Sequence, residues 1–168
     1  MKSYLYLLMS AALLISTTLL LAAGHTDPFA GTWKLNVEKS TYPRGSCPRQ
    51  MVIIMETAGD GVNYRSETLH ESGSVARAQY TADYSGKEAM VTGNAGVLLP
   101  VSLKKIDGNT VMASYKRGFQ VIATSRRTVS SGGRVMTVTT TSNDKEGRTV
   151  ITIGVYDKVE GATNAGAR

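Results

Sequence analysis

The sequence predicts an all-β domain, folded as an up-and-down antiparallel β-barrel of about 8–10 strands. From Asp27 onward, short runs rich in Val, Ile, Thr and Tyr alternate with clusters of Gly, Asp, Asn and Ser, and no run has the apolar spacing of a helix. The connections are nearly all short, so consecutive strands should pair as hairpins. Closing such a meander on itself removes its exposed edges, which favours a barrel.

The strands are bounded by turn residues, because Gly, Asn and Asp accept the backbone conformations that tight hairpins require. A two-sheet sandwich is the alternative, but it needs long crossovers, and the one long connection is 38–48, which contains Pro43, Gly45 and Pro48. The expected strands are 31–37, 49–57, 62–70, 74–84, 88–92, 98–106, 110–117, 119–130, 134–142 and 148–158.

The first 24 residues have the layout of a secretory signal peptide. Lys2 is followed by an apolar stretch and then by Ala22, Ala23 and Gly24, small residues suited to cleavage. An uncleaved membrane anchor is the competing interpretation, but polar Ser and Thr residues dilute the stretch. We therefore expect an exported protein, periplasmic or extracellular, with no stable membrane insertion after cleavage.

The rest of the chain is expected to form one barrel domain over 25–160, with a flexible tail at 161–168. A domain of this size can enclose its own core, and we expect a monomer. Cys47 is the only cysteine, so no disulfide can form within the chain. Its thiol has no neighbour in the sequence that would lower its pKa, so a residue without a role is favoured over a nucleophile.

Composition argues against several functions. The formal charge is +6 with a pI near 9.5, but Lys and Arg are scattered rather than clustered among aromatics, so nucleic-acid binding is not expected. As the histidine base of a catalytic triad the domain offers only His70, besides His25 at its very start, and neither a His-x-His nor a Cys-x-x-Cys motif occurs for a zinc site. Haem bound through His70 is the remaining cofactor alternative, and a surface position is favoured for that residue. We expect no cofactor, no metal and no enzyme activity.

Residues 27–36 (DPFAGTWKLN) resemble the first strand of the calycins, the superfamily of lipocalins and intracellular fatty-acid-binding proteins. Their first strand begins with Gly-x-Trp, here Gly31 and Trp33. The resemblance implies that the indole closes one end of the barrel and that a basic side chain from a late strand, Arg148 or Lys158, packs over it. Further segments extend the resemblance, to secreted lipocalin-like proteins of soil bacteria, over nearly the whole domain: 58–62, 91–94, 101–104 and 155–158.

One departure limits what the resemblance implies about a ligand. In fatty-acid-binding proteins the last strand carries Arg-x-Tyr, which holds the ligand carboxylate, whereas this chain has Gly154, Val155 and Tyr156 at that place. The arginine is missing. A charge-assisted clamp is therefore not expected from the last strand, although Tyr156 can still donate a hydrogen bond.

The preferred function is binding of a small hydrophobic or amphipathic ligand in the lumen of a lipocalin-like barrel, because the strand faces mix hydroxyls with apolar residues. The candidate lining residues are Tyr80, Tyr115, Arg126 and Tyr156. Arg126 and Arg127 are adjacent on one strand, so one must point inward, and the sequence leaves open which one. The alternative is a cell-envelope protein-binding module or inhibitor that acts through loops at the barrel mouth, including 38–48.

Overall fold

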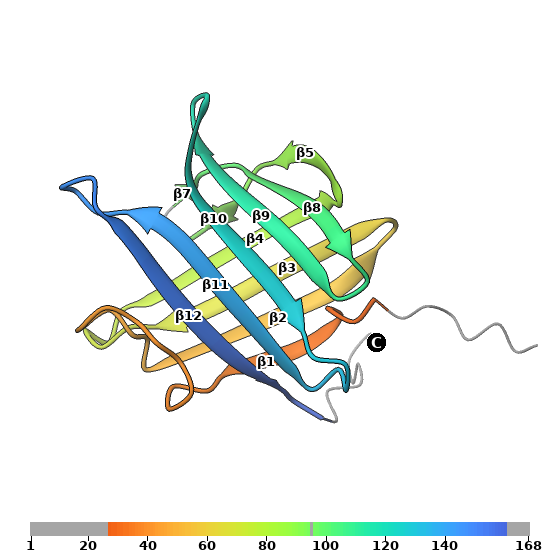
Figure 1. Cartoon of the computed structure of the whole chain (residues 1–168), viewed down its shortest axis with the longest axis horizontal. Coiled ribbons are helices and arrows are strands. Elements are labelled where there is room, and N and C mark those ends of the chain that lie inside the picture. The colour runs from red at the N-terminus through yellow and green to blue at the C-terminus, as the bar shows by residue number, and fades with distance from the viewer. Residues whose placement is uncertain (1–26, 95, 161–168) are drawn as a thin grey trace, which may run out of the picture.

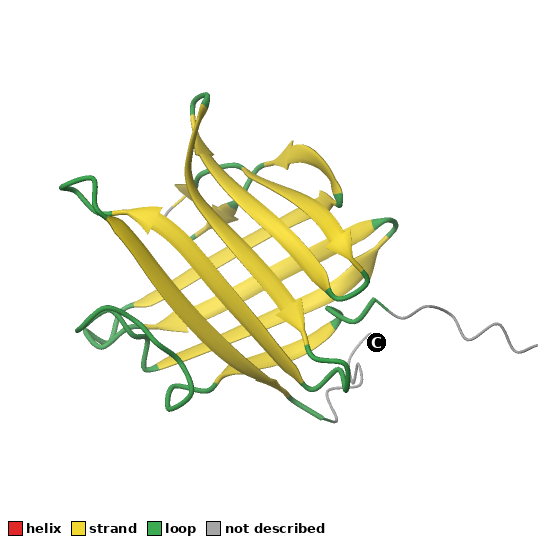
Figure 2. Cartoon of the chain, in the orientation of Figure 1, coloured by secondary structure: helices red, strands yellow, loops and turns green. Residues whose placement is uncertain are grey.

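One antiparallel sheet of twelve strands curls into a barrel (Figure 1). This computed structural model describes residues 27–94 and 96–160, and no helix occurs in them (Figure 2). The predicted signal peptide and tail lie outside this part. The strands are β1 (Gly31–Leu35), β2 (Gln50–Ala58), β3 (Gly61–Leu69), β4 (Val75–Asp83), β5 (Ser85–Ala89), β6 (Thr92–Gly93), β7 (Gly96–Val97), β8 (Val101–Asp107), β9 (Thr110–Arg117), β10 (Gln120–Val129), β11 (Val135–Asn143) and β12 (Thr149–Lys158).

The first and last strands pair, as the barrel prediction requires. β1 lies between β12 and β2, with Trp33 opposite Lys158 on one side and opposite Ile53 on the other. The strand order is β5-β8-β9-β10-β11-β12-β1-β2-β3-β4-β6-β7, so from β8 round to β4 each strand neighbours the strand that precedes or follows it, apart from the β12–β1 closure. The predicted all-β barrel of hairpins is confirmed.

The sheet opens between β4 and β8. β5 follows β4 after the single residue Tyr84, yet it pairs with β8 rather than with β4. Within the described residues no strand pairing joins β4 to β8, and the backbone N–H of Lys105 donates to the carbonyl of Tyr84 across this gap at 3.4 Å. The barrel is therefore continuous on all sides but one.

Most predicted strands lie within a few residues of the observed ones, and the misplaced elements fall next to this gap. The predicted strand at 88–92 is instead β5 at 85–89, and the short β6–β7 hairpin was not predicted. β8 begins at Val101 rather than at residue 98, directly after Pro100, which has no N–H to donate to a ladder. Two-residue strands carry too little of the period-two pattern to be recognised in a sequence.

The apolar core fills one end of the barrel. The largest fully buried side chains include Trp33, Phe29, Met55, Leu103 and Met136. The Trp33 indole N–H donates to the carbonyl of Phe29 at 2.8 Å, so the segment that precedes β1 folds under the ring. This end of the barrel is closed, as the first-strand motif implies.

The basic residue over the indole is Lys158, not Arg148. The Lys158 Nζ lies 4.9 Å from the centre of the Trp33 ring. Arg148 is exposed at the β11–β12 hairpin and pairs there with Asp144 at 2.7 Å, because it lies at the opposite end of β12 from Lys158. Gly31 has a φ of 133°, and a Cβ there would lie 2.5 Å from the Lys158 Cε, so glycine makes room for the lysine.

Candidate functional site

The inner face of β10 carries the arginine that lies inside the barrel, and it is Arg127. Ser125, Arg127 and Val129 are buried, whereas Arg126 is exposed, so the predicted lining role of Arg126 is wrong. The pleat alternates side chains between the two faces, and the alternate positions that end at the apolar Val129 point inward. That apolar residue was the signal in the sequence that could have chosen between the two arginines.

Three tyrosines surround the Arg127 guanidinium. Its Nη1 donates to the Tyr80 hydroxyl at 2.8 Å and its Nη2 to the Tyr115 hydroxyl at 3.2 Å. The Tyr64 ring lies under the guanidinium carbon, 5.1 Å from its centre, and stacks on Tyr80 with 4.6 Å between ring centres. Arg127 is thereby fixed in direction by β3, β4 and β9.

The charge of Arg127 has no acidic partner in the part of the chain that the structure describes. The side chain is 5% exposed, and a guanidinium stays protonated in proteins. Burying an ion costs on the order of several kcal/mol unless an opposite charge compensates it. Tyrosine hydroxyls and a ring face compensate part of this cost, and they leave the site suited to an anion.

Burial keeps Tyr64, Tyr80 and Tyr156 neutral. It raises the pKa of Tyr80 and of Tyr64 above the usual value, and the Arg127 charge opposes this rise in both. Burial also raises the pKa of Tyr156, and so does the nearby Tyr42. The site therefore offers neutral hydroxyl groups beside one fixed positive charge over the whole physiological pH range.

A cavity of about 210 Å³ adjoins Arg127 on the inner face of the barrel. Its walls combine hydroxyl groups with aliphatic side chains, an amphipathic lining of the kind that small-molecule sites use. The lining residues are Tyr42, Met51, Ile53, Tyr64, Tyr115, Ser125, Arg127, Val138, Thr140, Thr152 and Tyr156. Two of the hydroxyls, those of Ser125 and Thr140, bond each other at 2.6 Å across the β10–β11 ladder.

Gly154 makes room for the tyrosines of this cavity. A Cβ at residue 154 would lie 2.8 Å from the Tyr156 ring and 3.0 Å from the Tyr42 hydroxyl. Gly154 pairs with Val138, and Val138 pairs with Arg127. Residues 154 and 127 therefore lie on the same rung, that is, in one row of paired residues that runs across neighbouring strands. The arginine that the resemblance implied at residue 154 is absent there, and β10 supplies a guanidinium on the same rung.

Three of the four predicted lining residues reach this region. Tyr80 holds Arg127, Tyr115 holds it and lines the cavity, and Tyr156 lines the cavity and donates to the Met51 sulfur at 3.2 Å. Their role in binding a ligand stays a prediction. Tyr64 and Tyr42 were not predicted from the sequence. Tyr64 lies on a strand whose inward face was not identified, and Tyr42 lies on the long connection 38–48.

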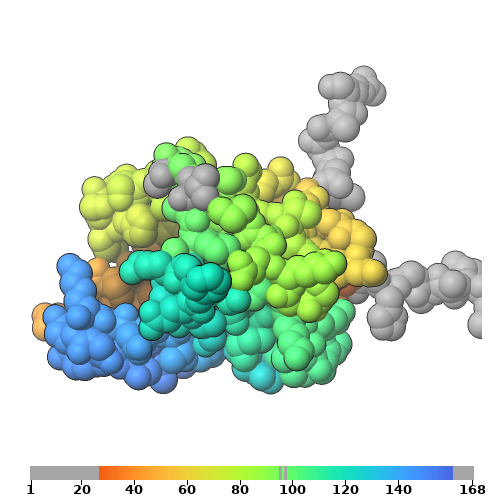
Figure 3. Space-filling model, turned by 90° about the horizontal axis from the view of Figure 1, so that it is seen from above, coloured from red at the N-terminus to blue at the C-terminus, as the bar shows by residue number. Residues whose placement is uncertain are grey.

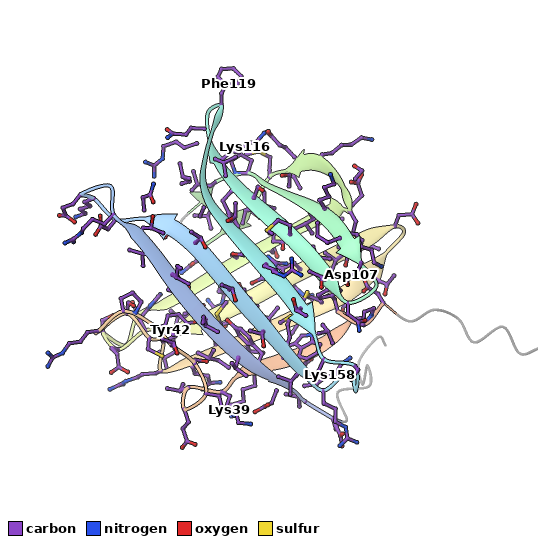
Figure 4. The ribbon with its side chains drawn as sticks, viewed as in Figure 1. Lys39, Tyr42, Asp107, Lys116, Phe119 and Lys158 are labelled. Carbon is purple, nitrogen blue, oxygen red and sulfur yellow. The ribbon has the colours of Figure 1, made fainter. Side chains whose placement is uncertain are left out.

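The observed connection between β1 and β2 spans 36–49 and is bound to the barrel. Thr41 exchanges two backbone hydrogen bonds of 2.7 Å with Ile153 of β12, which directs Tyr42 towards the lumen (Figure 4). Cys47 is half-buried, and burial and the Glu71 charge raise the pKa of its thiol, so it is not activated as a nucleophile. His70 is exposed at the turn after β3.

A second hollow, of about 540 Å³ and mostly apolar, lies beside the gap in the sheet. It is lined by Ala78, Val91, Leu98, Leu99 and Tyr115, and it shares Tyr115 with the lumen cavity. Among residues 27–94 and 96–160, no three or more His, Cys, Asp or Glu side chains gather as metal ligands would. The same residues contain no helix of the length and hydropathy needed to cross a bilayer.

No protein-family profile and no curated protein matches this sequence. Among solved structures, the chain is similar to zebrafish ileal bile acid-binding protein in complex with cholic acid, with a TM-score of 0.53 and 16% sequence identity. The match covers 79% of this chain and 99% of that chain. At this identity the similarity shows the fold alone, and the chain has an antiparallel β-barrel of the lipocalin and fatty-acid-binding protein type.

Proposed function

We propose that this protein is a binding protein rather than an enzyme, and that it holds a small amphipathic anion in the barrel lumen. The observation that carries the proposal is the buried Arg127 guanidinium, which has hydroxyl partners but no carboxylate in the described part of the chain. The anionic group accepts hydrogen bonds from Arg127 and the nearby hydroxyls, and the apolar part packs on Met51, Ile53 and Val138.

The cavity limits the size of the ligand. Its volume of about 210 Å³ lies below the roughly 300–1,000 Å³ of typical drug-sized sites. A compact carboxylate or similar anion with a short apolar portion fits this space better than a sterol-sized molecule. The similarity to a bile acid-binding protein supports a small-molecule role for the barrel, and the lining of this chain supports a smaller ligand.

Calorimetry with a matched series tests the proposal. Butyrate, hexanoate and octanoate are titrated into the protein beside the uncharged alcohols of the same length. The carboxylates should bind about 10–100-fold more tightly, because hydrogen bonds to a charged group contribute about 1.5–3 kcal/mol.

Arg127→Met should abolish that preference, and Arg126→Met is the control on the outer face of the same strand. Circular dichroism establishes that both variants fold. Equal affinity for carboxylates and alcohols, or an unchanged preference in Arg127→Met, is incompatible with the proposed anion site.

We also infer that the protein is exported, since residues 1–24 combine Lys2, an apolar stretch and terminal small residues. Intact mass and N-terminal sequencing of the protein from cell envelope and medium fractions test this. Cleavage after Ala23 or Gly24 is the expected result, and a full-length chain in the cytosolic fraction contradicts it.

A further inference from the structure

The β9–β10 hairpin projects beyond the strands on both sides of it. Pairing of β8 with β9 ends at Val101 and Tyr115, and pairing of β10 with β11 ends at Ala123 and Ser142. Residues 116–121 therefore continue as a two-stranded tip outside the barrel wall (Figure 1). The backbone N–H of Lys116, which donates to the carbonyl of Pro100 at 3.1 Å, still ties the base of the tip to the wall.

An aromatic ring occupies the end of this tip. Gly118, with φ of 58°, takes the first position of a two-residue turn, and Phe119 takes the second. Phe119 is 106% exposed, so its ring contacts essentially nothing in the molecule, and it points away from the barrel (Figure 4). Val121, on the returning strand, is 46% exposed. The tip thus presents apolar surface that the fold itself does not bury.

Basic residues flank the ring. Lys116 forms an ion pair with Glu88 at 2.7 Å, whereas none of the ion pairs among residues 27–94 and 96–160 includes Arg117. A projecting aromatic beside a free cation is the combination found in elements that enter the interface of an anionic bilayer. The positive charge and the apolar ring at the tip therefore both favour contact with an anionic bilayer.

The tip stands at the end of the molecule that carries the apolar hollow beside the sheet gap. Tyr115, the residue before Lys116, lines that hollow together with Leu98 and Leu99. Figure 3 looks down on this end, where the teal hairpin lies beside a recess between the yellow-green β3–β4 and the blue β11–β12. A surface that contacted the Phe119 ring would therefore lie close to the apolar hollow and to this recess.

We propose that the 116–121 tip docks the protein on an anionic lipid surface, with the Phe119 ring among the acyl chains and Arg117 at the headgroups. A protein partner is disfavoured, because a stable protein interface buries about 1,200–2,000 Å², which a two-stranded tip does not offer alone. A lipid interface needs no such complementary shape. This docking does not depend on the ligand proposed for the lumen.

Tryptophan fluorescence on vesicles tests the docking. Trp33 is the only tryptophan and is buried at the closed end, so it is a constant background. Phe119→Trp places a second indole at the tip, and Ile151→Trp places one at the outer face of β12, where the native side chain is 55% exposed. Vesicles of phosphatidylglycerol and phosphatidylcholine, with and without brominated acyl chains, are added to each variant.

In anionic vesicles the Phe119→Trp emission should shift to the blue and be quenched by the brominated chains, while Ile151→Trp should not change. Phe119→Ser should weaken vesicle partitioning about tenfold, and Arg117→Gln should weaken it about fivefold at low salt. The matched indole at residue 151 separates docking by the tip from attachment through another part of the chain, which would not place the tip indole selectively among the acyl chains.

Three outcomes overturn the proposal. The first is equal quenching of the two reporters, and the second is an unchanged partition coefficient in Phe119→Ser. The third is a blue shift of the tip indole that grows with protein concentration in the absence of lipid, which would assign the tip to contact with a second copy of this chain.

Discussion

The two ends of the barrel are built by the same strands and have opposite chemistry. At the closed end one rung consists of Val129, Met136 and Tyr156, and two residues along each strand the rung is Arg127, Val138 and Gly154. A further two residues along, the rung is Ser125, Thr140 and Thr152. The inner face therefore changes from apolar through a charge to hydroxyls within four residues of each strand.

Because of this gradient, one end of the sheet stabilises the fold and the other end forms the proposed binding site. The closed end contains Trp33 and most of the large buried apolar side chains, and their burial supplies the main driving force for folding. The open half contains polar groups, and burying a polar group opposes folding unless the group forms hydrogen bonds. Stability and binding should consequently respond to different substitutions. Four experiments test this difference between the two ends.

The largest effect is expected from alkaline pH. Burial raises the folded-state pKa of Tyr64, Tyr80 and Tyr156 above that of the unfolded chain, near 10. The unfolded state therefore releases protons first, so their contribution to stability is complete below about pH 10 and is lost as pH rises further. Tyr84, which donates to Asp27 at 2.7 Å near the closed end, adds to this effect.

Urea unfolding at a series of pH values measures this loss, and the part of the tyrosinate absorbance that belongs to Tyr64, Tyr80 and Tyr156 should rise only together with unfolding. Titration of Tyr64 and Tyr80 near pH 10 in the folded protein would mean that water reaches the surroundings of Arg127.

The second effect is the loss of the indole at the closed end. Trp33→Ala should lower the free energy of unfolding by about 3–5 kcal/mol, as for large aromatic side chains removed from a core. Thr152→Ala, in the lining of the cavity, should cost less than about 1 kcal/mol. Urea denaturation of the two variants compares the ends directly, and equal losses would remove the distinction between them.

A smaller loss of stability should follow from adding one methyl group at residue 154, which lies on the same rung as Arg127. In Gly154→Ala the new Cβ meets the Tyr156 ring and the Tyr42 hydroxyl, so overpacking should cost about 1–3 kcal/mol and reduce the cavity. Gly132→Ala, at a turn where a Cβ meets nothing within 4 Å, is the matched control. Thermal unfolding measures both, and a neutral Gly154→Ala would show that the tyrosines move freely.

The smallest effect concerns the cation over the indole. Lys158→Met keeps the aliphatic contact with Gly31 and removes the charge 4.9 Å from the Trp33 ring, which should cost about 0.5–2 kcal/mol. Arg148→Met removes an exposed ion pair and should cost less than Lys158→Met, because water already screens that pair. If the two variants lost the same stability, Lys158 would have no special role at the closed end.

The closed end could be predicted from the sequence, because its signals are local. Gly31 and Trp33 lie in one short motif, and the hairpins that bring β12 beside β1 are marked by turn residues. Barrel closure predicts that β1 pairs with β12, and the register then places Lys158 opposite Trp33. The choice between Lys158 and Arg148 required the register, since only the register shows which end of β12 faces the indole.

The open half could be predicted only in part, because it is assembled from distant strands. Tyr80 and Tyr115 were predicted as residue types suited to a lumen, but the sequence left open which of Arg126 and Arg127 points inward, and the candidate chosen was Arg126. A shift of one residue in a strand reverses the face of every side chain, and β10 has polar residues on both faces. The contribution of Tyr42 depended on the binding of 36–49 to β12, for which the sequence has no local signal.

The most direct test of the anion site is NMR of the arginine side chains during titration with hexanoate. The guanidinium Nε–H resonance of Arg127, assigned from its absence in Arg127→Met, should shift and saturate with the same affinity that calorimetry reports. The resonance of the exposed Arg126 should not move. Saturable binding of hexanoate with no change at Arg127 would contradict the account, because the anion would then lie elsewhere in the molecule.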